Sequence, residues 1–457
     1  MAISTKFPIG GGNPLKKAKS RNGTIRKSTI LNLVFLLCFF PFLKLIPWIT
    51  PEVQPWGALL ALFCLLTFGV NKDTVSSLVM IFLLLLASAA AVSFLIGRAP
   101  GSVVMLSGAY ALPLFILLAL KDNTHLLSVR VLYASLLLYL LVGILQSFSL
   151  LVWAEPYVKH WIPRFYGAPV GLAGRGVTFL AHEPSGAGFI ITLMMATASY
   201  FYVLDKISGR ALATVILTVL AMLVMNKSGT AFLLLLIFFS VFLLTMFWYG
   251  STASKTKTLF LVLPIASLTA LVAMLVIRDY AGSARYILLL HKLVDFASSA
   301  KLSTYAGLAE VTGGRFLSVF MGYASLIDGF GLGHGIAAYQ LEYARLSSLL
   351  DIHWAEYSIA RLFVMGQAQK PNAYAAQIAL DLGVAGFLII VLIVLFCWRQ
   401  RGKRGFWSGE RRFNKSLIVA VFATATFIIF VRSTTTMPIA WVMLAYVHDF
   451  IKSGIRR

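Results

Sequence analysis

Apolar segments long enough to cross a lipid bilayer recur along this chain, and they constrain its fold more than any other feature. Hydrophobic residues make up 59% of its 457 residues, charged residues only 12%, and the mean hydropathy is +0.87. A soluble fold of this size has too little interior to bury so much apolar surface. The sequence therefore predicts an all-α polytopic membrane protein, and it excludes a soluble enzyme, a disordered chain and a secreted disulfide scaffold.

A helix needs about 20 mostly apolar residues to span the bilayer. Twelve segments are candidates, and the second, seventh, eleventh and twelfth are short; they are residues 29–49, 53–70, 74–96, 102–120, 130–153, 186–204, 209–225, 229–249, 258–278, 374–398, 416–432 and 435–451. Tryptophans lie near several predicted ends, as expected at a membrane interface. They are Trp48, Trp56, Trp153, Trp248, Trp398 and Trp441.

The predicted spans divide the chain into four regions. A basic tail over 1–28 precedes nine spans over 29–278, which include an external loop at 154–185. A long external loop follows at 279–373, and residues 374–457 hold the last three spans and a short tail. The long loop contains helix-like stretches, so we expect it to be partly helical and to pack over the bundle.

Basic residues outnumber acidic ones by 39 to 16, which gives a net charge of +23. In a soluble protein this excess would suggest a nucleic-acid partner, but here the basic residues lie at the ends of apolar segments. Placing the amino terminus in the cytoplasm puts 24 of the 39 on the cytoplasmic side, as the positive-inside rule requires. We therefore expect both termini in the cytoplasm, the lipid bilayer as a partner, and no nucleic acid.

Titratable side chains gather in the two external loops, which hold nine of the sixteen acidic residues and five of the seven histidines. Chemistry is therefore expected on that side of the membrane. Cys38, Cys64 and Cys397 lie in apolar segments and form neither a disulfide framework nor a metal-ligand pattern. The usual metal-binding motifs are missing as well, so neither a metal nor a cofactor is expected.

The shorter external loop ends in a cluster of chemically useful residues. Arg175, His182 and Glu183 come just before Pro184, which is well placed near the start of the sixth predicted span. The amino terminus of a helix offers free N–H groups and partial positive charge, so it can bind an anion. The alternative is that Glu183 only complements the helix dipole and pairs with Arg175.

Other spans that run inward also begin beside a cation. Lys227 precedes the eighth span, Lys370 and Asn372 precede the tenth, and Arg432 precedes the twelfth. A cation at the positive end of a helix is unfavourable unless an anion is bound there. We therefore expect these residues to converge on an anionic group, with lipid phosphate and simple helix capping as the alternative explanation.

The long loop adds two glycine clusters and two further arginines. Arg315 follows the first cluster, and His334 lies in the second, Gly329–Gly335. Glycine at alternate positions allows either a close approach to a ligand or a tight turn. Arg315 and Arg361 are candidate phosphate clamps, because guanidinium groups bind phosphate oxygens in pairs. Ion-paired surface arginines are the alternative.

Together these motifs resemble the bacterial O-antigen polymerase (Wzy-type) and O-antigen ligase superfamily. The resemblance extends from about residue 175 to about 390, and its motifs are Arg175…Glu183-Pro184-Ser185, Asn226-Lys227-Ser228-Gly229-Thr230, Gly314-Arg315, Gly331-x-Gly333-x-Gly335, Asn372-Ala373-Tyr374 and Asp381-x-Gly383-x-x-Gly386. It implies about twelve membrane helices in a GT-C-like, lipid-sugar-using glycosyltransferase fold. It also implies metal-independent transfer of sugars from undecaprenyl diphosphate.

Ligases of this superfamily carry a histidine just before the asparagine of the tenth-span motif, whereas Pro371 precedes Asn372 here. The expected activity is therefore polymerisation of lipid-linked repeat units at the periplasmic face of a bacterial inner membrane. Glu183, Arg315 and Arg361 are the expected catalytic residues, and Arg175, His182, Lys227, His334, Lys370, Asn372 and Arg432 are expected to bind substrate. A ligase or a lipid-sugar flippase is the alternative, and a chain-length regulator and a flippase are possible partners.

Overall fold

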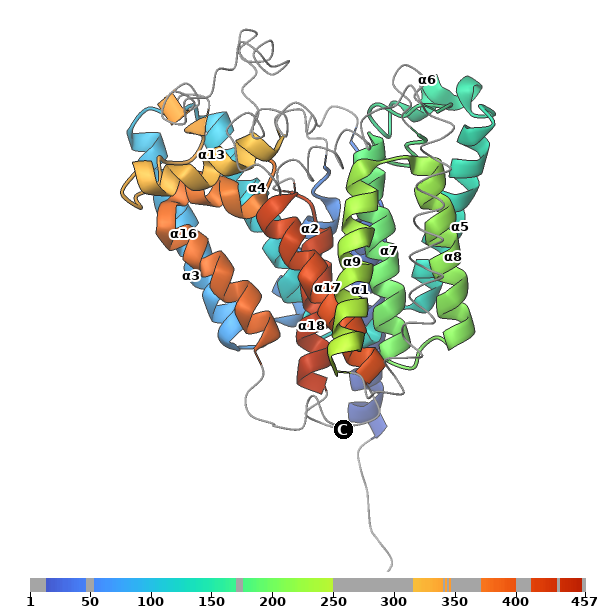
Figure 1. The fold of residues 1–457 in the computed structure, drawn as a ribbon. Helices are drawn as coiled ribbons and strands as arrows, with labels where there is room; N and C mark the ends of the chain where they lie inside the picture. The colour runs from blue at the N-terminus through green and yellow to red at the C-terminus, as the bar shows by residue number, and fades with distance from the viewer. Residues whose placement is uncertain are drawn as a thin grey trace, which may run out of the picture.

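The computed structural model describes residues 14–46, 53–169, 176–249, 315–339, 342, 345–346, 371–399, 412–433 and 436–453. Over these residues the chain is a bundle of thirteen α-helices with two short 3-10 helices and no strand (Figure 1). The all-α prediction is confirmed for this part of the chain. The predicted boundaries of the four regions stay predictions.

Most of the described helices make up the bundle. They are α1 (Pro14–Phe39), α2 (Trp56–Phe68), α3 (Thr74–Leu95), α4 (Pro100–Leu120), α5 (Val129–Ser147), α7 (Pro184–Val203), α8 (Gly209–Asn226), α9 (Gly229–Tyr249), α16 (Tyr374–Trp398), α17 (Arg412–Val431) and α18 (Ile439–Ser453). The short α6 (Glu155–Val158) and α13 (Arg315–Asp328) lie at one end of the bundle (Figure 1).

Eight helices are long and apolar enough to cross a membrane, and each coincides with one of the twelve predicted spans. The other four predictions differ or are untested. The first predicted span was expected to reach residue 49, but α1 stops at Phe39, because the residue before Pro41 is disfavoured in a helix. Helices α2 and α18 have only 13 and 15 residues, and the span predicted at 258–278 lies outside the described residues.

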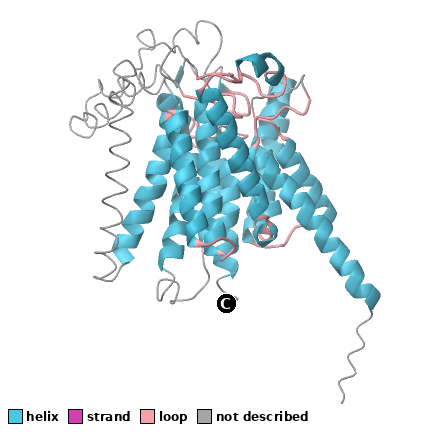
Figure 2. Ribbon diagram, turned by 90° about the vertical axis from the view of Figure 1, so that its right-hand side faces the viewer, coloured by secondary structure: helices cyan, strands magenta, loops and turns pink. Residues whose placement is uncertain are grey.

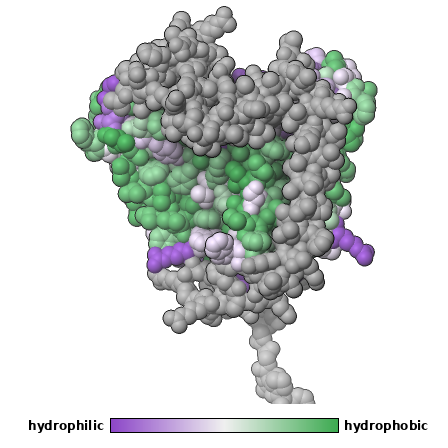
Figure 3. All heavy atoms as spheres, in the orientation of Figure 1, coloured by the Kyte–Doolittle hydropathy of each residue, from purple (hydrophilic) through white to green (hydrophobic). Residues whose placement is uncertain are grey.

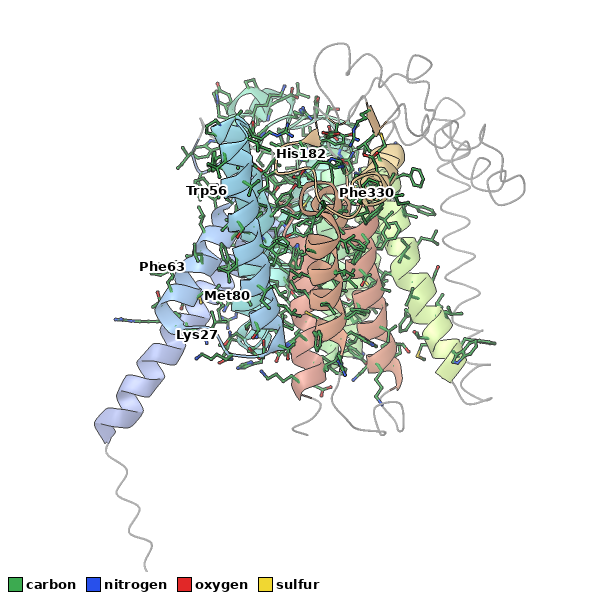
Figure 4. The ribbon with its side chains drawn as sticks, turned by 90° about the vertical axis from the view of Figure 1, so that its left-hand side faces the viewer. Lys27, Trp56, Phe63, Met80, His182 and Phe330 are labelled. Atoms are coloured by element: carbon green, nitrogen blue, oxygen red, sulfur yellow. The ribbon has the colours of Figure 1, made fainter. Side chains whose placement is uncertain are left out.

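The central helix α7 is far more buried than the outer helices. Within the apolar stretch of α7, 94% of the residues are buried, against 22% for α3. The exposed side chains of the outer helices are themselves apolar, such as Phe63 and Met80, which point away from the bundle (Figure 4). Figure 3 shows the resulting band of apolar surface between the two ends. Contact between this apolar surface and water is unfavourable, so the surface is suited to contact with lipid.

The two ends of the bundle differ in structure. The helices run back and forth, so α1 begins and α18 ends at one end, here named the termini end (Figure 1). The opposite end, named the loop end, carries α6, α13 and the longer loops (Figure 2). The loops there are joined to each other: the N–H of Lys44 donates to the carbonyl of Trp161 at 2.7 Å. The assignment of each end to a side of the membrane stays a prediction.

An ionic cluster closes the termini end. The ammonium group of Lys121 is fully buried. It donates to Asp73 and lies 3.2 Å from a carboxylate oxygen of Asp122. Lys452, near the end of α18, donates to the other oxygen of Asp122. The cluster thereby connects the start of α3 with the ends of α4 and α18.

Replacing Lys121 by Met leaves Asp73 without its main cation, while Lys452 remains beside Asp122. Removing one member of a buried ion pair costs about 3–5 kcal/mol. Because Lys452 remains in the cluster, the expected loss is at the lower end, about 3 kcal/mol. Thermal unfolding in detergent should show a clearly lower midpoint for Lys121→Met. Lys72→Met, at an exposed neighbouring position, should leave the midpoint unchanged; equal effects of the two substitutions would contradict the role of the cluster.

The same cluster makes stability depend on pH. Burial acts to raise the pKa of the Asp122 carboxyl, but the hydrogen bond from Lys452 and the charge of Lys121 outweigh it and lower that pKa to about 2. A depressed folded-state pKa adds stability above the ordinary pKa of 3.8, and this stability is lost as the pH falls toward about 2. The midpoint of Asp122→Asn should therefore fall less than that of the natural chain over this pH range.

Candidate functional site

Glu183 occupies the position just before α7, with extended backbone, and Pro184 is the first helical residue. One carboxylate oxygen of Glu183 accepts a hydrogen bond from Arg164 at 3.0 Å, and the other accepts one from the Ser185 hydroxyl at 3.3 Å. The expected partner Arg175 lies outside the described residues. Sequence reasoning missed Arg164, which lies 19 residues away with no local motif to mark it.

His182 packs against the first turn of α7. Its ring is buried, with its centre 4.3 Å from that of Phe42 (Figure 4 labels His182). Gly186 makes this packing possible, since a Cβ there would lie 2.8 Å from Phe42 and 3.1 Å from the His182 ring. The imidazole is therefore held between Phe42, which follows α1, and the first turn of α7.

The turn between α8 and α9 holds the segment that precedes Glu183. Asn226 is fully buried and donates its side-chain N–H to the carbonyl of Val177 at 3.0 Å. The N–H of Val177 in turn donates to the carbonyl of Met225 at 3.0 Å. Lys227 ends α8 in the left-handed conformation, with φ of 51°. Two segments that lie 49 residues apart in the sequence are thus in direct contact.

Helices α7 and α9 meet close to their amino termini. A Cβ on Gly188, one turn into α7, would lie 2.8 Å from the backbone nitrogen of Ala231 in the first turn of α9. Such a separation is too short for any side chain, so the glycine permits the two backbones to touch. Glu183 and Lys227 each lie a few residues before this contact, and both are therefore at the loop end beside it.

Arg432, the residue after the end of α17, lies in the same region. The central carbon of its guanidinium group lies 6.0 Å from the centre of the Phe189 ring, which follows Gly188 on α7. This is the distance of a cation–π contact. The structure therefore brings together four of the predicted site residues, Glu183, His182, Lys227 and Arg432, around the start of α7.

Asn372 lies at the start of α16, beside the segment that follows α17. Its carbonyl accepts a hydrogen bond from the N–H of Ser433 at 2.8 Å, and its own N–H donates to the Ser318 hydroxyl of α13 at 3.4 Å. Asn372 is therefore bound to Ser433, the residue that directly follows Arg432. Arg315 is the first residue of α13, but its side chain lies outside the described part of the chain, as do Arg361 and Lys370.

His334 belongs to a different part of the loop end. Its ring nitrogens lie 3.9 Å from Asp328 and 3.8 Å from Glu342, and Arg345 pairs with both acids. The N–H of His334 donates to the carbonyl of Leu380 in α16 at 2.9 Å. The described partners of His334 therefore include Asp328, Glu342 and the backbone of α16.

The second glycine cluster is a tight turn that packs on α16. A Cβ on Gly333 would lie 2.4 Å from the carbonyl oxygen of Asp381, and Gly383 interrupts the helix there with φ of 66°. The Asp381 side chain accepts a hydrogen bond from the Tyr110 hydroxyl of α4. Of the two roles considered for these glycines, close approach to a ligand and a tight turn, the described backbone shows the turn.

Electrostatically, the region around α7 suits an anion. Helices α7, α9 and α16 all begin at the loop end, and each contributes partial positive charge there. Lys227 and Arg432 add full charges, while the negative charge of Glu183 is balanced by Arg164. The described residues contain no group of three or more His, Cys, Asp or Glu side chains placed to hold a metal.

No protein-family model, curated protein or solved structure matches this chain. What the structure establishes is a polytopic, all-helical membrane protein with eight candidate spans among its described residues. The resemblance to the O-antigen polymerase and ligase superfamily stays a sequence-based prediction.

The contact between α7 and α9 predicts a difference between two glycine substitutions. Gly188→Ala should push the helices apart and cost about 1–3 kcal/mol, as overpacking does. Gly108→Ala, in α4, should be neutral or gain about 0.5–1 kcal/mol, because no atom lies within 4 Å of its Cβ position. Thermal unfolding in detergent measures both, and an equal response would show that α7 and α9 do not touch at Gly188.

Proposed function

We propose that this chain is a polymerase that joins undecaprenyl-diphosphate-linked oligosaccharide repeat units into a surface polysaccharide. The observation that carries the proposal is the contact of α7 and α9 at Gly188 and Ala231, with Arg432 beside it. Two positive helix ends and two cations at one place form a binding site for a diphosphate. The apolar band between the two ends of the bundle would accommodate the polyprenyl tail of the same substrate.

The proposed reaction needs no cofactor from the chain. A hydroxyl oxygen of the acceptor repeat unit attacks the anomeric carbon of the donor glycan, and the bond from that carbon to the diphosphate oxygen breaks. Undecaprenyl diphosphate leaves with the electron pair, so negative charge develops on it. Lys227, Arg432 and the helix ends stabilise this developing negative charge. Such electrostatic stabilisation by groups already in place is usually the largest single contribution to catalysis.

Glu183 is the proposed general base. Its carboxylate accepts the proton of the attacking hydroxyl, and Arg164 and Ser185 hold it in place through both oxygens. Arg315, Arg361, Arg175 and Lys370 are proposed as further contacts to the diphosphate. His182, His334 and Asn372 are proposed to contact the glycan.

The proposal places the loop end in the periplasm of a bacterium, with both termini in the cytoplasm, and the bundle in a GT-C-like fold. The proposed partners are the lipid-linked donor and acceptor, a chain-length regulator and a flippase. A ligase would transfer finished polymer to a lipid core, and a flippase would move the repeat unit without joining it. Pro371 in place of the ligase histidine favours the polymerase.

The proposal predicts the activity of purified protein with a defined lipid-linked repeat unit. The natural chain should give a ladder of products. Lys227→Met and Arg432→Met should each slow the reaction about 10²-fold, as loss of one charge-stabilising group does, and Glu183→Gln by about 10²–10⁴-fold. Arg130→Met, an exposed cation at the termini end, is the matched control and should keep full activity.

Cells that lack the gene separate the alternatives. Accumulation of single lipid-linked repeat units indicates a polymerase, whereas free polymer without its attachment indicates a ligase. Absence of external repeat units indicates a flippase. A full ladder from all three site variants at matched expression would contradict the site, and no ladder from the natural chain would contradict the function.

A further inference from the structure

The last turn of α13 and the turn that follows it present large apolar side chains to the outside. Phe330 is 95% exposed, Ile327 83% and Leu332 78%. Scattered exposed apolar residues are common, but three within six residues form a patch that water disfavours. The patch continues along the outer face of α13, because Phe320 is also exposed and lies seven residues, about two helical turns, before Ile327.

The exposure is fixed by the backbone of the turn. The carbonyl of Gly331 accepts a hydrogen bond from the N–H of Val384 at 2.9 Å, and the N–H of Gly335 donates to the carbonyl of Asp381 at 3.1 Å. Gly331 and Gly335 both have positive φ, 79° and 87°, which glycine adopts without strain. The turn is therefore held against the kink of α16, with Phe330 and Leu332 directed away from it.

The patch is continuous with the lipid-facing surface of α16. Below the kink this helix exposes one stripe of apolar side chains, namely Val384, Leu388, Leu392 and Leu395. These residues recur at helical spacing, so they occupy a single face of a membrane-spanning helix. Val384, the first of them, is in contact with the turn, since a Cβ on Gly331 would lie 3.1 Å from its side chain.

The end of α3 extends the same surface on the other side. Leu95 is 86% exposed and Ile96 58%. The loop is fastened here as well, because the N–H of Ile336 donates to the Ser93 hydroxyl at 2.9 Å. In Figure 4 Phe330 lies at about the height of Trp56, one of the tryptophans expected at the membrane interface.

Charged groups border the patch. Asp328 directly follows Ile327 and pairs with Arg345 at 2.5 Å, and Arg345 also donates to Glu342 at 2.8 Å. The guanidinium group of Arg98 donates to the carbonyl of His334 at 3.5 Å. Apolar side chains beside a charged margin are the arrangement of segments that lie in a membrane interface without spanning it.

We propose that the outer face of α13 and the turn Phe330–Leu332 insert into the bilayer beside α3 and α16. The partner is the acyl region of the lipid, into which Ile327, Phe330 and Leu332 project, while Asp328 and Arg345 stay at the polar boundary. The segment is thus a second type of membrane contact in this protein, a surface insertion in addition to the spans. The inference rests on the bilayer alone and not on the proposed function.

A depth measurement in lipid nanodiscs tests this proposal. Cys38, Cys64 and Cys397 are buried and would be replaced by Ala. A nitroxide is then attached at Phe330→Cys or Leu332→Cys, and its collision rates with oxygen and with a water-soluble nickel complex are compared. Oxygen concentrates among acyl chains, whereas the nickel complex stays in water. Leu388→Cys is the lipid-facing reference, and Lys159→Cys of the exposed α6 region is the aqueous reference.

We expect oxygen to dominate at both positions, as at Leu388→Cys, with a loss of nickel collisions relative to Lys159→Cys. Dominance of nickel at both positions would place the turn in water and overturn the proposal. Low collision rates with both reagents would mean that protein covers the turn, such as a second copy of this chain, and would overturn it too. Each outcome is independent of whether the chain polymerises glycans.

Discussion

The hydrocarbon of the bilayer is the constraint from which the rest of this structure follows. Backbone polar groups have no water there, so every spanning segment is a helix that satisfies its own hydrogen bonds. Charged side chains are costly at mid-membrane and are displaced to the two ends of the bundle. Lys121 and its carboxylates close one end, and Glu183, Lys227 and Arg432 gather at the other. We propose the loop end as the place for chemistry, because the residues of the proposed site gather there.

Glycine converts this general layout into a particular site. At Gly188 it lets α7 and α9 touch, so that two positive helix ends lie side by side. At Gly333 and Gly383 it lets the turn after α13 pack against the kink of α16, and this packing directs Phe330 outward. The same residue type therefore builds the proposed anion site and the proposed membrane insertion. The second glycine cluster, which was considered as a ligand-binding loop, therefore acts by packing against α16.

Hydropathy in the sequence predicted eight of the spans, because the pattern along one helix reports its own burial in lipid. Hydropathy predicted the first span to end too late, because the helical conformation is disfavoured just before Pro41 although the apolar segment continues. Contacts between distant segments left no local signal: Arg164 beside Glu183 and the complete burial of Lys121 depend on tertiary packing. The gathering of Glu183, Lys227 and Arg432 at one end was predicted from topology, whereas the Gly188 contact that places them was not.

The central claim is that the start of α7 binds a diphosphate, and binding tests it more directly than turnover does. Native mass spectrometry of the purified protein with undecaprenyl diphosphate, at fixed salt, measures the affinity without any glycan. We predict one tightly bound lipid, with affinity weakened in both Lys227→Met and Arg432→Met and unchanged in Arg130→Met. Equal affinity of all four proteins, or preference for a neutral polyprenol over the diphosphate, would contradict it.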